Sequence, residues 1–194
     1  MSPRRDLEII GELVPPGSRV LDLGCGDGEL LAYLQAQRGC SGYGIEIDDA
    51  NVLACAKRGV DVIQLNLEDG LAIFEDKSFD VVLQLETLQH LRNTEKMLRE
   101  TARVGRIGIV SFPNFAHWPN RVRVATGRMP VTKALPYEWY DTPNIRVGTF
   151  ADFEVLARRD GLRILDAFGI EHGAVVRRWP NLLASVAVFR FERG

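Results

Sequence analysis

Short apolar runs alternate along the first 111 residues with stretches in which apolar residues recur every three or four positions. An apolar run of four to eight residues is typical of a strand buried on both faces, whereas the longer period is that of an amphipathic helix. The predicted strands are residues 19–23, 42–46, 60–67, 79–85 and 106–111. The predicted helices are residues 6–14, 29–39, 49–58 and 94–103. This alternation predicts an α/β fold in which helices cover both faces of a mostly parallel sheet.

Residues 113–148 break the alternation. This segment holds five of the nine prolines, two of the three tryptophans and four arginines. So long an irregular segment is typical of a lid, a binding segment or a partly helical insert, and a solvent-facing excursion is the alternative. Exposed aromatic side chains are costly, so we expect burial of four of them, namely Phe115, Trp118, Trp139 and Tyr140.

Regular structure returns near the end of the chain. Thr149 and Asp152 form a capping-box-like start to a helix that ends near Gly161. Residues 162–168 and 184–191 are predicted strands. The residues between these two strands leave little room for a crossover helix, so we expect the strands to pair antiparallel.

Length, charge and cysteine content narrow the class of protein. The 194 residues suit a single domain over residues 1–194, and a net charge of −2 gives no field that would favour nucleic acid or an anionic membrane as partner. The three cysteines, at positions 25, 40 and 55, form no metal-ligand pair and no disulfide framework, which favours a cytoplasmic protein. No apolar run approaches the ~20 residues that span a bilayer, and the acidic N-terminal segment does not look like a signal peptide.

The strongest chemical signal is a glycine turn between the first predicted strand and the next helix. It has the sequence DLGCGDG over residues 22–28. Its spacing differs from the G-x-G-x-x-G of dinucleotide-binding turns because Glu29 occupies the third glycine position, and no Gly-Lys-Ser/Thr follows as in a P-loop. Acidic residues around the turn favour a ligand with a cationic part and no phosphates, such as S-adenosylmethionine.

Polar residues at the ends of the next strands extend this site. Glu46 ends the second strand, where a carboxylate accepts hydrogen bonds from ribose hydroxyls. Asn66 and Leu67 follow the third strand and offer a carbonyl and an N–H to adenine, and the backbone of Gln84 is expected to face the methionine part. Cys25, at a helix N-terminus, could be an activated thiol, but it lacks an evident partner and is interpreted as a small packing residue.

Candidate bases for methyl transfer are scattered, and none is assigned a catalytic role. They are Glu86, His90, His117, Tyr137 and Tyr140. The segment 113–148 is also basic, with Arg121, Arg123, Arg128, Lys133 and Arg146. These charges are open to three interpretations: recognition of a small carboxylate, docking to an acidic partner surface, or plain solvation.

The chain resembles a known family. The glycine turn and residues 44–46 and 79–82 are similar to the class I methyltransferase pattern, and IVSFPNF at 109–115 and GRMPVTKALPYEWYDTPNI at 127–145 resemble the MetW methionine-biosynthesis family. The resemblance covers nearly the whole chain. It implies a Rossmann-like three-layer sandwich whose seven-stranded sheet has an antiparallel last strand.

The resemblance also implies a bacterial cytoplasmic protein of methionine biosynthesis that supports a MetX-type homoserine O-acyltransferase. An active S-adenosylmethionine-dependent methyltransferase with a small-molecule acceptor is the alternative. Asn66 departs from the aspartate more usual at its position, which weakens the adenine contact. The expected site for S-adenosylmethionine or S-adenosylhomocysteine comprises Asp22, Gly24, Cys25, Gly26, Gly28, Glu46, Ile47, Asn66, Leu67 and Gln84.

Overall fold

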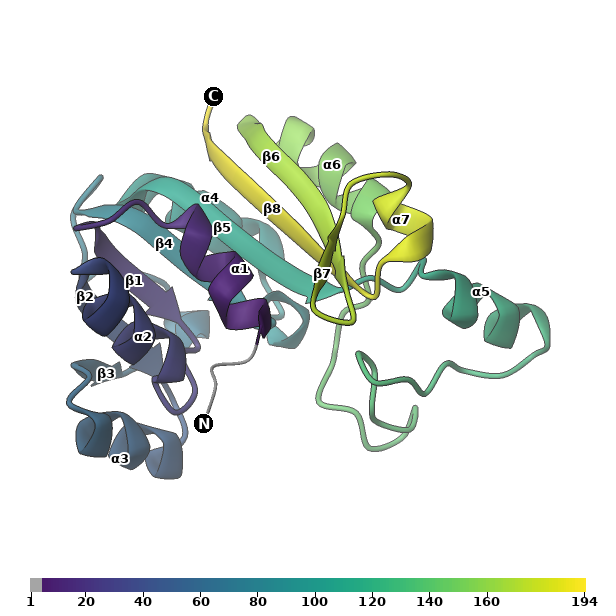
Figure 1. Ribbon diagram of the computed structural model, residues 1–194, viewed down its shortest axis with the longest axis horizontal. Helices are drawn as coiled ribbons and strands as arrows, with labels where there is room; N and C mark the ends of the chain where they lie inside the picture. Colours follow the sequence, from purple (N-terminus) through teal and green to yellow (C-terminus); the bar gives the residue numbers. More distant parts are fainter. Residues whose placement is uncertain (1–4) are drawn as a thin grey trace.

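The computed structural model describes residues 5–194, and its strands form one sheet in the order β3-β2-β1-β4-β5-β8-β6-β7 (Figure 1). The strands are β1 (Arg19–Leu23), β2 (Ser41–Glu46), β3 (Val62–Gln64), β4 (Phe79–Leu85), β5 (Gly105–Pro113), β6 (Leu162–Glu171), β7 (Ala174–Val176) and β8 (Val186–Arg193). The first five strands are parallel, and β8 lies between β5 and β6 and pairs antiparallel with both. The predicted α/β fold and its antiparallel C-terminal pair are confirmed.

Helices cover both faces of this sheet (Figure 1). On one face, α1 (Arg5–Leu13), α2 (Glu29–Arg38) and α3 (Asp49–Arg58) pack through side chains such as Ile10, Leu34 and Cys55. On the other, α4 (Thr94–Val104) and α6 (Phe150–Arg159) pack through Leu98 and Phe153. The remaining helices are η1 (Leu67–Asp69), η2 (Leu88–His90), α5 (Trp118–Ala125) and α7 (Pro180–Leu183).

Three expectations about the elements need correction. The sheet has eight strands rather than seven, because the chain turns back after β6 at His172 and Gly173, both with positive φ, and adds the short strand β7. The third strand is shorter than 60–67, since Asn66 ends the extended backbone by capping η1.

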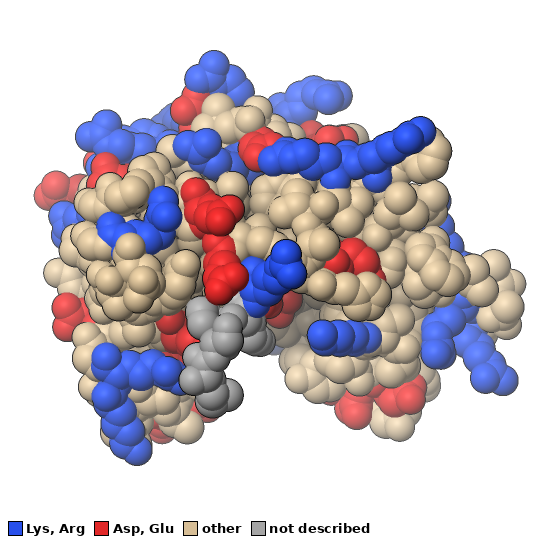
Figure 2. Space-filling view, in the orientation of Figure 1, with Lys and Arg blue, Asp and Glu red and all other residues tan. Residues whose placement is uncertain are grey.

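Figure 2 shows acidic and basic side chains intermixed over much of the visible surface.

The third correction concerns the aromatic residues of 113–148. The segment is partly helical, as one of the interpretations required, because it contains α5. However, Trp118, Trp139 and Tyr140 are 53%, 70% and 71% exposed, and Phe115 is half-buried. Trp118 lies on this helix, which projects from the end of the sheet (Figure 1) and buries only Asn120. Trp139 and Tyr140 lie in residues 136–141, which are all exposed, so no layer of the fold covers these rings.

No helix among residues 5–194 is long and apolar enough to cross a bilayer.

Candidate functional site

The glycine turn joins β1 to α2 in a conformation that requires glycine. Gly24, Gly26 and Gly28 have φ of +77°, +55° and +77°. The N–H groups of Gly24 and Cys25 donate to the Ile45 carbonyl at 2.8 and 3.0 Å, which ties the turn to β2. A Cβ placed on Gly26 would meet no atom of residues 5–194 within 4 Å. The backbone at Gly26 therefore borders open space that a ligand can approach closely.

Glu46 closes the other side of this turn. The residue is 9% exposed. Its Oε2 accepts the Gly26 N–H at 2.9 Å, and its Oε1 accepts the N–H groups of Ile47 and Asp48 at 2.7 and 2.9 Å. An ionised carboxylate has about four acceptor sites, so one lone pair of Oε2 remains for a further donor. The predicted role of Glu46 as an acceptor for a ribose hydroxyl fits this geometry.

Asp22 lies beneath the same turn, 4% exposed, in register with Gly44 of β2. Burial, and secondly the negative charge of Glu46, raises the pKa of Asp22 from 3.8 to about 7. Two buried carboxyl residues near one site create a strong preference for a positive charge close by. S-adenosylmethionine carries its positive charges on the sulfonium and the amino group, so these two carboxyl groups fit this class of ligand.

The Cys25 side chain is a packing group. Its Sγ lies 3.8 Å from Cys55 Sγ, and Cys55 donates to the Gly26 carbonyl at 3.2 Å. A Cβ on Gly44 would come within 2.3 Å of Cys25 Sγ, so the thiol fills the space over that glycine. Burial raises the pKa of the Cys25 thiol, followed by the charge of Asp22, which keeps it protonated and unreactive.

The other predicted ligand contacts lie along the same sheet edge with different exposure. Register pairs Glu46 with Gln64, which brings Asn66 and Leu67 to the carboxyl end next to β2. Asn66 is exposed, and its carbonyl accepts the Glu68 N–H at 3.0 Å, so an adenine contact would have to share that oxygen. Ile47 is 59% exposed at this edge, whereas Leu67 is buried.

The side chain of Gln84 is fully buried, and neither amide atom has a hydrogen-bond partner in the part of the chain that the structure describes. Strand alternation directs it to the same face as Val82, which packs in a cluster with Met97 of α4. Any contribution of Gln84 to a ligand must therefore come from its backbone, as the sequence analysis expected.

The five candidate bases lie in different surroundings. Glu86 is exposed with φ of +50°, and His90 Nδ1 lies 3.1 Å from the Pro143 carbonyl. His117 is 7% exposed and 3.8 Å from Glu171, and burial lowers its pKa, which favours the neutral imidazole. Tyr137 and Tyr140 are exposed. This arrangement supports no assignment of a catalytic base.

A cavity of about 340 Å³ was not foreseen from the sequence. It lies between α4, α6 and residues 144–149, and its apolar lining includes Phe112, Phe115 and Leu156. Arg146 forms part of the wall, and the N–H groups of Ile145 and Arg146 both donate to the Gln89 carbonyl at 3.0 Å. These residues come from distant parts of the chain, so no local motif could have indicated the cavity.

The sequence analysis also missed the role of Asn114. It is 1% exposed at the end of β5. Its Oδ1 accepts the N–H groups of Ala116 and Phe150, and its Nδ2 donates to the Ala184 carbonyl at 2.8 Å. One side chain therefore ties the start of the irregular segment to α6 and to the end of α7.

Solved structures share this fold. A S-adenosylmethionine-dependent methyltransferase from Mesorhizobium loti superposes with a TM-score of 0.73 at 13% identity, covering 98% of this chain and 99% of the other. Another from Thermotoga maritima has a TM-score of 0.71 at 19% identity, covering 98% and 88%. The chain thus has the α/β fold of the S-adenosylmethionine-dependent methyltransferases.

The sequence comparisons identify a family that is more specific than the fold. The model of the methionine biosynthesis protein MetW matches residues 4–191, and the chain belongs to this family. The bifunctional methionine biosynthesis protein MetXA/MetW of Rhodopirellula baltica is 39% identical over 97% of this chain. A ubiquinone biosynthesis O-methyltransferase of Hahella chejuensis is 34% identical over 64% of it. The chain spans 32% of the first relative and 56% of the second.

Proposed function

We propose that this chain binds S-adenosylmethionine or S-adenosylhomocysteine at the glycine turn and supports a MetX-type homoserine O-acyltransferase in methionine biosynthesis. The observation that carries the ligand is the turn itself, in which Gly26 borders open space between the carboxylate of Glu46 and the buried Asp22. Membership of the MetW family supports the pathway. The joining of MetXA and MetW names in one relative supports the partner.

Each residue of the site contributes a different contact to the ligand. The backbone at Gly26 admits the ligand closely, the spare lone pair of Glu46 accepts from a ribose hydroxyl, and Asp22 balances the cationic end. Bound S-adenosylmethionine supplies an activated methyl group. A protein that binds this product of methionine metabolism can couple its concentration to acyl transfer, provided that the two proteins bind each other with an affinity that depends on the ligand.

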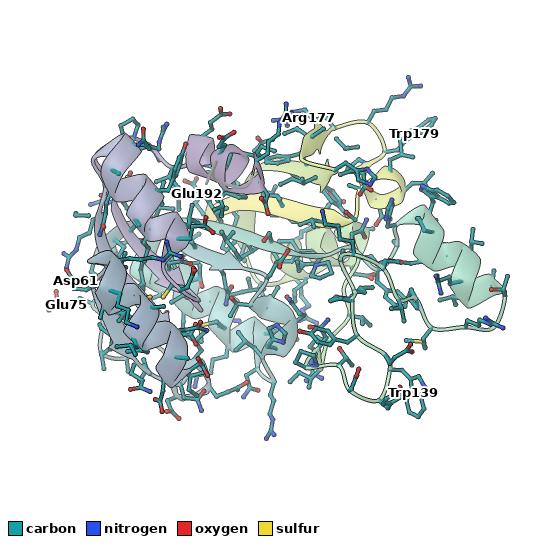
Figure 3. All side chains as sticks on the ribbon, turned by 60° about the horizontal axis from the view of Figure 1, so that its bottom comes forward. Asp61, Glu75, Trp139, Arg177, Trp179 and Glu192 are labelled. Atoms are coloured by element: carbon teal, nitrogen blue, oxygen red, sulfur yellow. The ribbon has the colours of Figure 1, made fainter. Side chains whose placement is uncertain are left out.

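Titration calorimetry tests the ligand. We expect the unmodified chain to bind S-adenosylmethionine or S-adenosylhomocysteine, and Glu46→Ala to weaken binding at least tenfold, since it removes a charged acceptor from a nearly dry site. Glu75→Ala is the matched control, because Glu75 is exposed and away from the turn (Figure 3). Absence of binding by the unmodified chain, or equal affinities for all three proteins, would contradict the proposal.

Co-purification with the homoserine O-acyltransferase tests the partner. Acyl transfer is then measured with and without this chain while S-adenosylmethionine is varied. A change in the acyl-transfer rate without methylated product supports the accessory role. An acyltransferase that neither binds this chain nor changes its rate would rule that role out.

Active methyl transfer to a small molecule is the second candidate, favoured by the 34% identity to an O-methyltransferase. Methyl transfer needs chiefly alignment of the acceptor and exclusion of water, so the lack of an assigned base does not argue strongly against it. Formation of S-adenosylhomocysteine with a pool of small acceptors, in the absence of the acyltransferase, would support this candidate over the accessory role.

A further inference from the structure

Residues 118–147, here named the arm, carry most of the uncovered apolar surface. Among the described residues, seventeen large hydrophobic side chains are exposed, and nine of them belong to the arm. They are Trp118, Val122, Val124, Met129, Tyr137, Trp139, Tyr140, Ile145 and Val147. Exposed apolar side chains gathered in one segment are typical of interaction sites in folded proteins.

The arm also has a charge of its own. It contains five basic residues and two acidic ones, a net charge of +3, so the remainder of the chain, with a total of −2, carries −5. No arm arginine or lysine forms an ion pair with a carboxylate of residues 5–194, whereas body arginines such as Arg58 and Arg103 do. Figure 2 shows basic side chains standing out at the α5 end of the molecule.

Both ends of the arm are fixed to the body, whereas residues 136–141 between them are all exposed. At the start, Asn120 Nδ2 donates to the Asn114 carbonyl at 3.3 Å. At the end, the N–H groups of Ile145 and Arg146 donate to Gln89. Between these anchors Trp139 and Tyr140 meet edge to face, with ring centroids 5.6 Å apart, and Trp139 points away from the body (Figure 3). The arm thus holds an aromatic pair at low entropic cost to a partner.

We propose that the arm is a docking surface for a different protein chain, and that Trp139 and Tyr140 enter an apolar groove whose rim carries carboxylates. The groove must be apolar because the rings are, and its rim must be acidic because the basic residues of the arm have no acidic partner in residues 5–194. This inference rests on the proposed function, in which the partner is the homoserine O-acyltransferase.

An anionic lipid surface fits less well than a protein. It is negative throughout and would repel Glu138 and Asp141, which flank Trp139 and Tyr140, whereas a protein can place its carboxylates opposite the basic residues alone. A second copy of this chain also offers exposed carboxylates outside any ion pair of residues 5–194, such as Asp61 and Glu75, so self-association is measured as a separate outcome below. A separate protein with unpaired carboxylates around an apolar groove satisfies both requirements.

Binding of the tagged acyltransferase to full-length variants tests the proposal. The double variant Trp139→Ala/Tyr140→Ala should bind at least about 30-fold more weakly, as expected for central aromatic contacts. Trp179→Ala is the matched control, since Trp179 is 62% exposed but lies outside the arm (Figure 3), and it should bind within threefold of the unmodified chain. Arg123→Glu/Arg128→Glu, at exposed positions, should bind at least tenfold more weakly and flatten the salt dependence.

The outcomes separate the docking surface from the function. Binding by the unmodified chain that both arm variants retain would overturn the docking surface and leave the proposed function standing. No binding by the unmodified chain would overturn both. Self-association, or binding to anionic vesicles, that is lost in the arm variants while acyltransferase binding persists would assign the arm to a second copy or to a lipid surface. Unchanged affinity for S-adenosylmethionine and unchanged melting temperature in both arm variants, together with lost acyltransferase binding, would support the proposal.

Discussion

Replacement of Asp22 by Asn tests the electrostatics of the glycine turn, because the amide keeps the shape of the side chain and removes its charge. The buried Asp22 carboxyl has its pKa raised from 3.8 to about 7. Below pH 3.8 it is protonated in both the folded and the unfolded chain. As the pH rises towards 7, the unfolded chain releases this proton and the folded chain retains it, so the free energy of unfolding falls.

The magnitude follows from the size of this window. Each pH unit inside this window costs about 1.4 kcal/mol and the slope halves at its upper end, so between pH 5 and pH 7 the unmodified protein should lose about 2 kcal/mol that Asp22→Asn does not lose. Above pH 7 the difference should level off. Urea unfolding of both proteins from pH 5 to pH 8 measures it, and any constant offset from the amide cancels in the comparison.

Asp61→Asn is the control, because Asp61 is exposed and loses little hydration on folding. Its unfolding free energy should follow that of the unmodified protein across the series. Parallel curves for Asp22→Asn and the unmodified protein would refute the reasoning, since they would mean that Asp22 is ionised in the folded protein without cost.

Three further predictions concern packing and reactivity. Asn114→Ala should lower the free energy of unfolding by about 3 kcal/mol, since it strands the buried N–H groups of Ala116 and Phe150. Gly42→Ala should cost about 3 kcal/mol or more, because φ is +137° and the added Cβ would lie 1.7 Å from the Val20 carbonyl oxygen. In the native protein at neutral pH, iodoacetamide should modify Cys25 slowly, because burial raises the pKa of its thiol.

Urea unfolding measures the first two, and mass spectrometry the third. Asn93→Ala is the control for Asn114, because the Asn93 side chain caps no helix N–H, and Gly148→Ala is the control for Gly42, because its Cβ would meet only ordinary contacts at 3.4 Å. Losses no larger than those of the controls would contradict the two stability predictions. Alkylation of native Cys25 at the rate of a free thiol would contradict the third.

The sequence predicted the sheet and the glycine turn because both depend on local patterns. Apolar runs with β propensity mark the buried strands, and the turn needs glycine wherever φ is positive. The sequence could not show that Glu46 would accept the Gly26 N–H, since that bond depends on the approach of β2 to the turn.

The predicted burial of the aromatic residues in the arm was wrong for a physical reason. Aromatic residues are usually buried, so Trp139 and Tyr140 were expected to be covered, and that inference assumes that all apolar surface is covered within one chain. The 340 Å³ cavity and the Asn114 hydrogen bonds were missed because they join residues far apart in sequence. The periodicity of the sequence carries no information about such long-range contacts.

The position of β8 between β5 and β6 has a consequence for how the protein folds during synthesis. A ribosome releases β5 and β6 before β8 exists, so β5 presents an open edge to other chains until residues 186–193 emerge. The N-terminal half, with the glycine turn, can assemble early from neighbouring strand–helix units. The last strand, β8, must then insert between the exposed edges of β5 and β6. Because β8 lies far from β5 in sequence, this step is expected to be slow. Nascent chains stalled before this step are where we expect aggregation and chaperone binding.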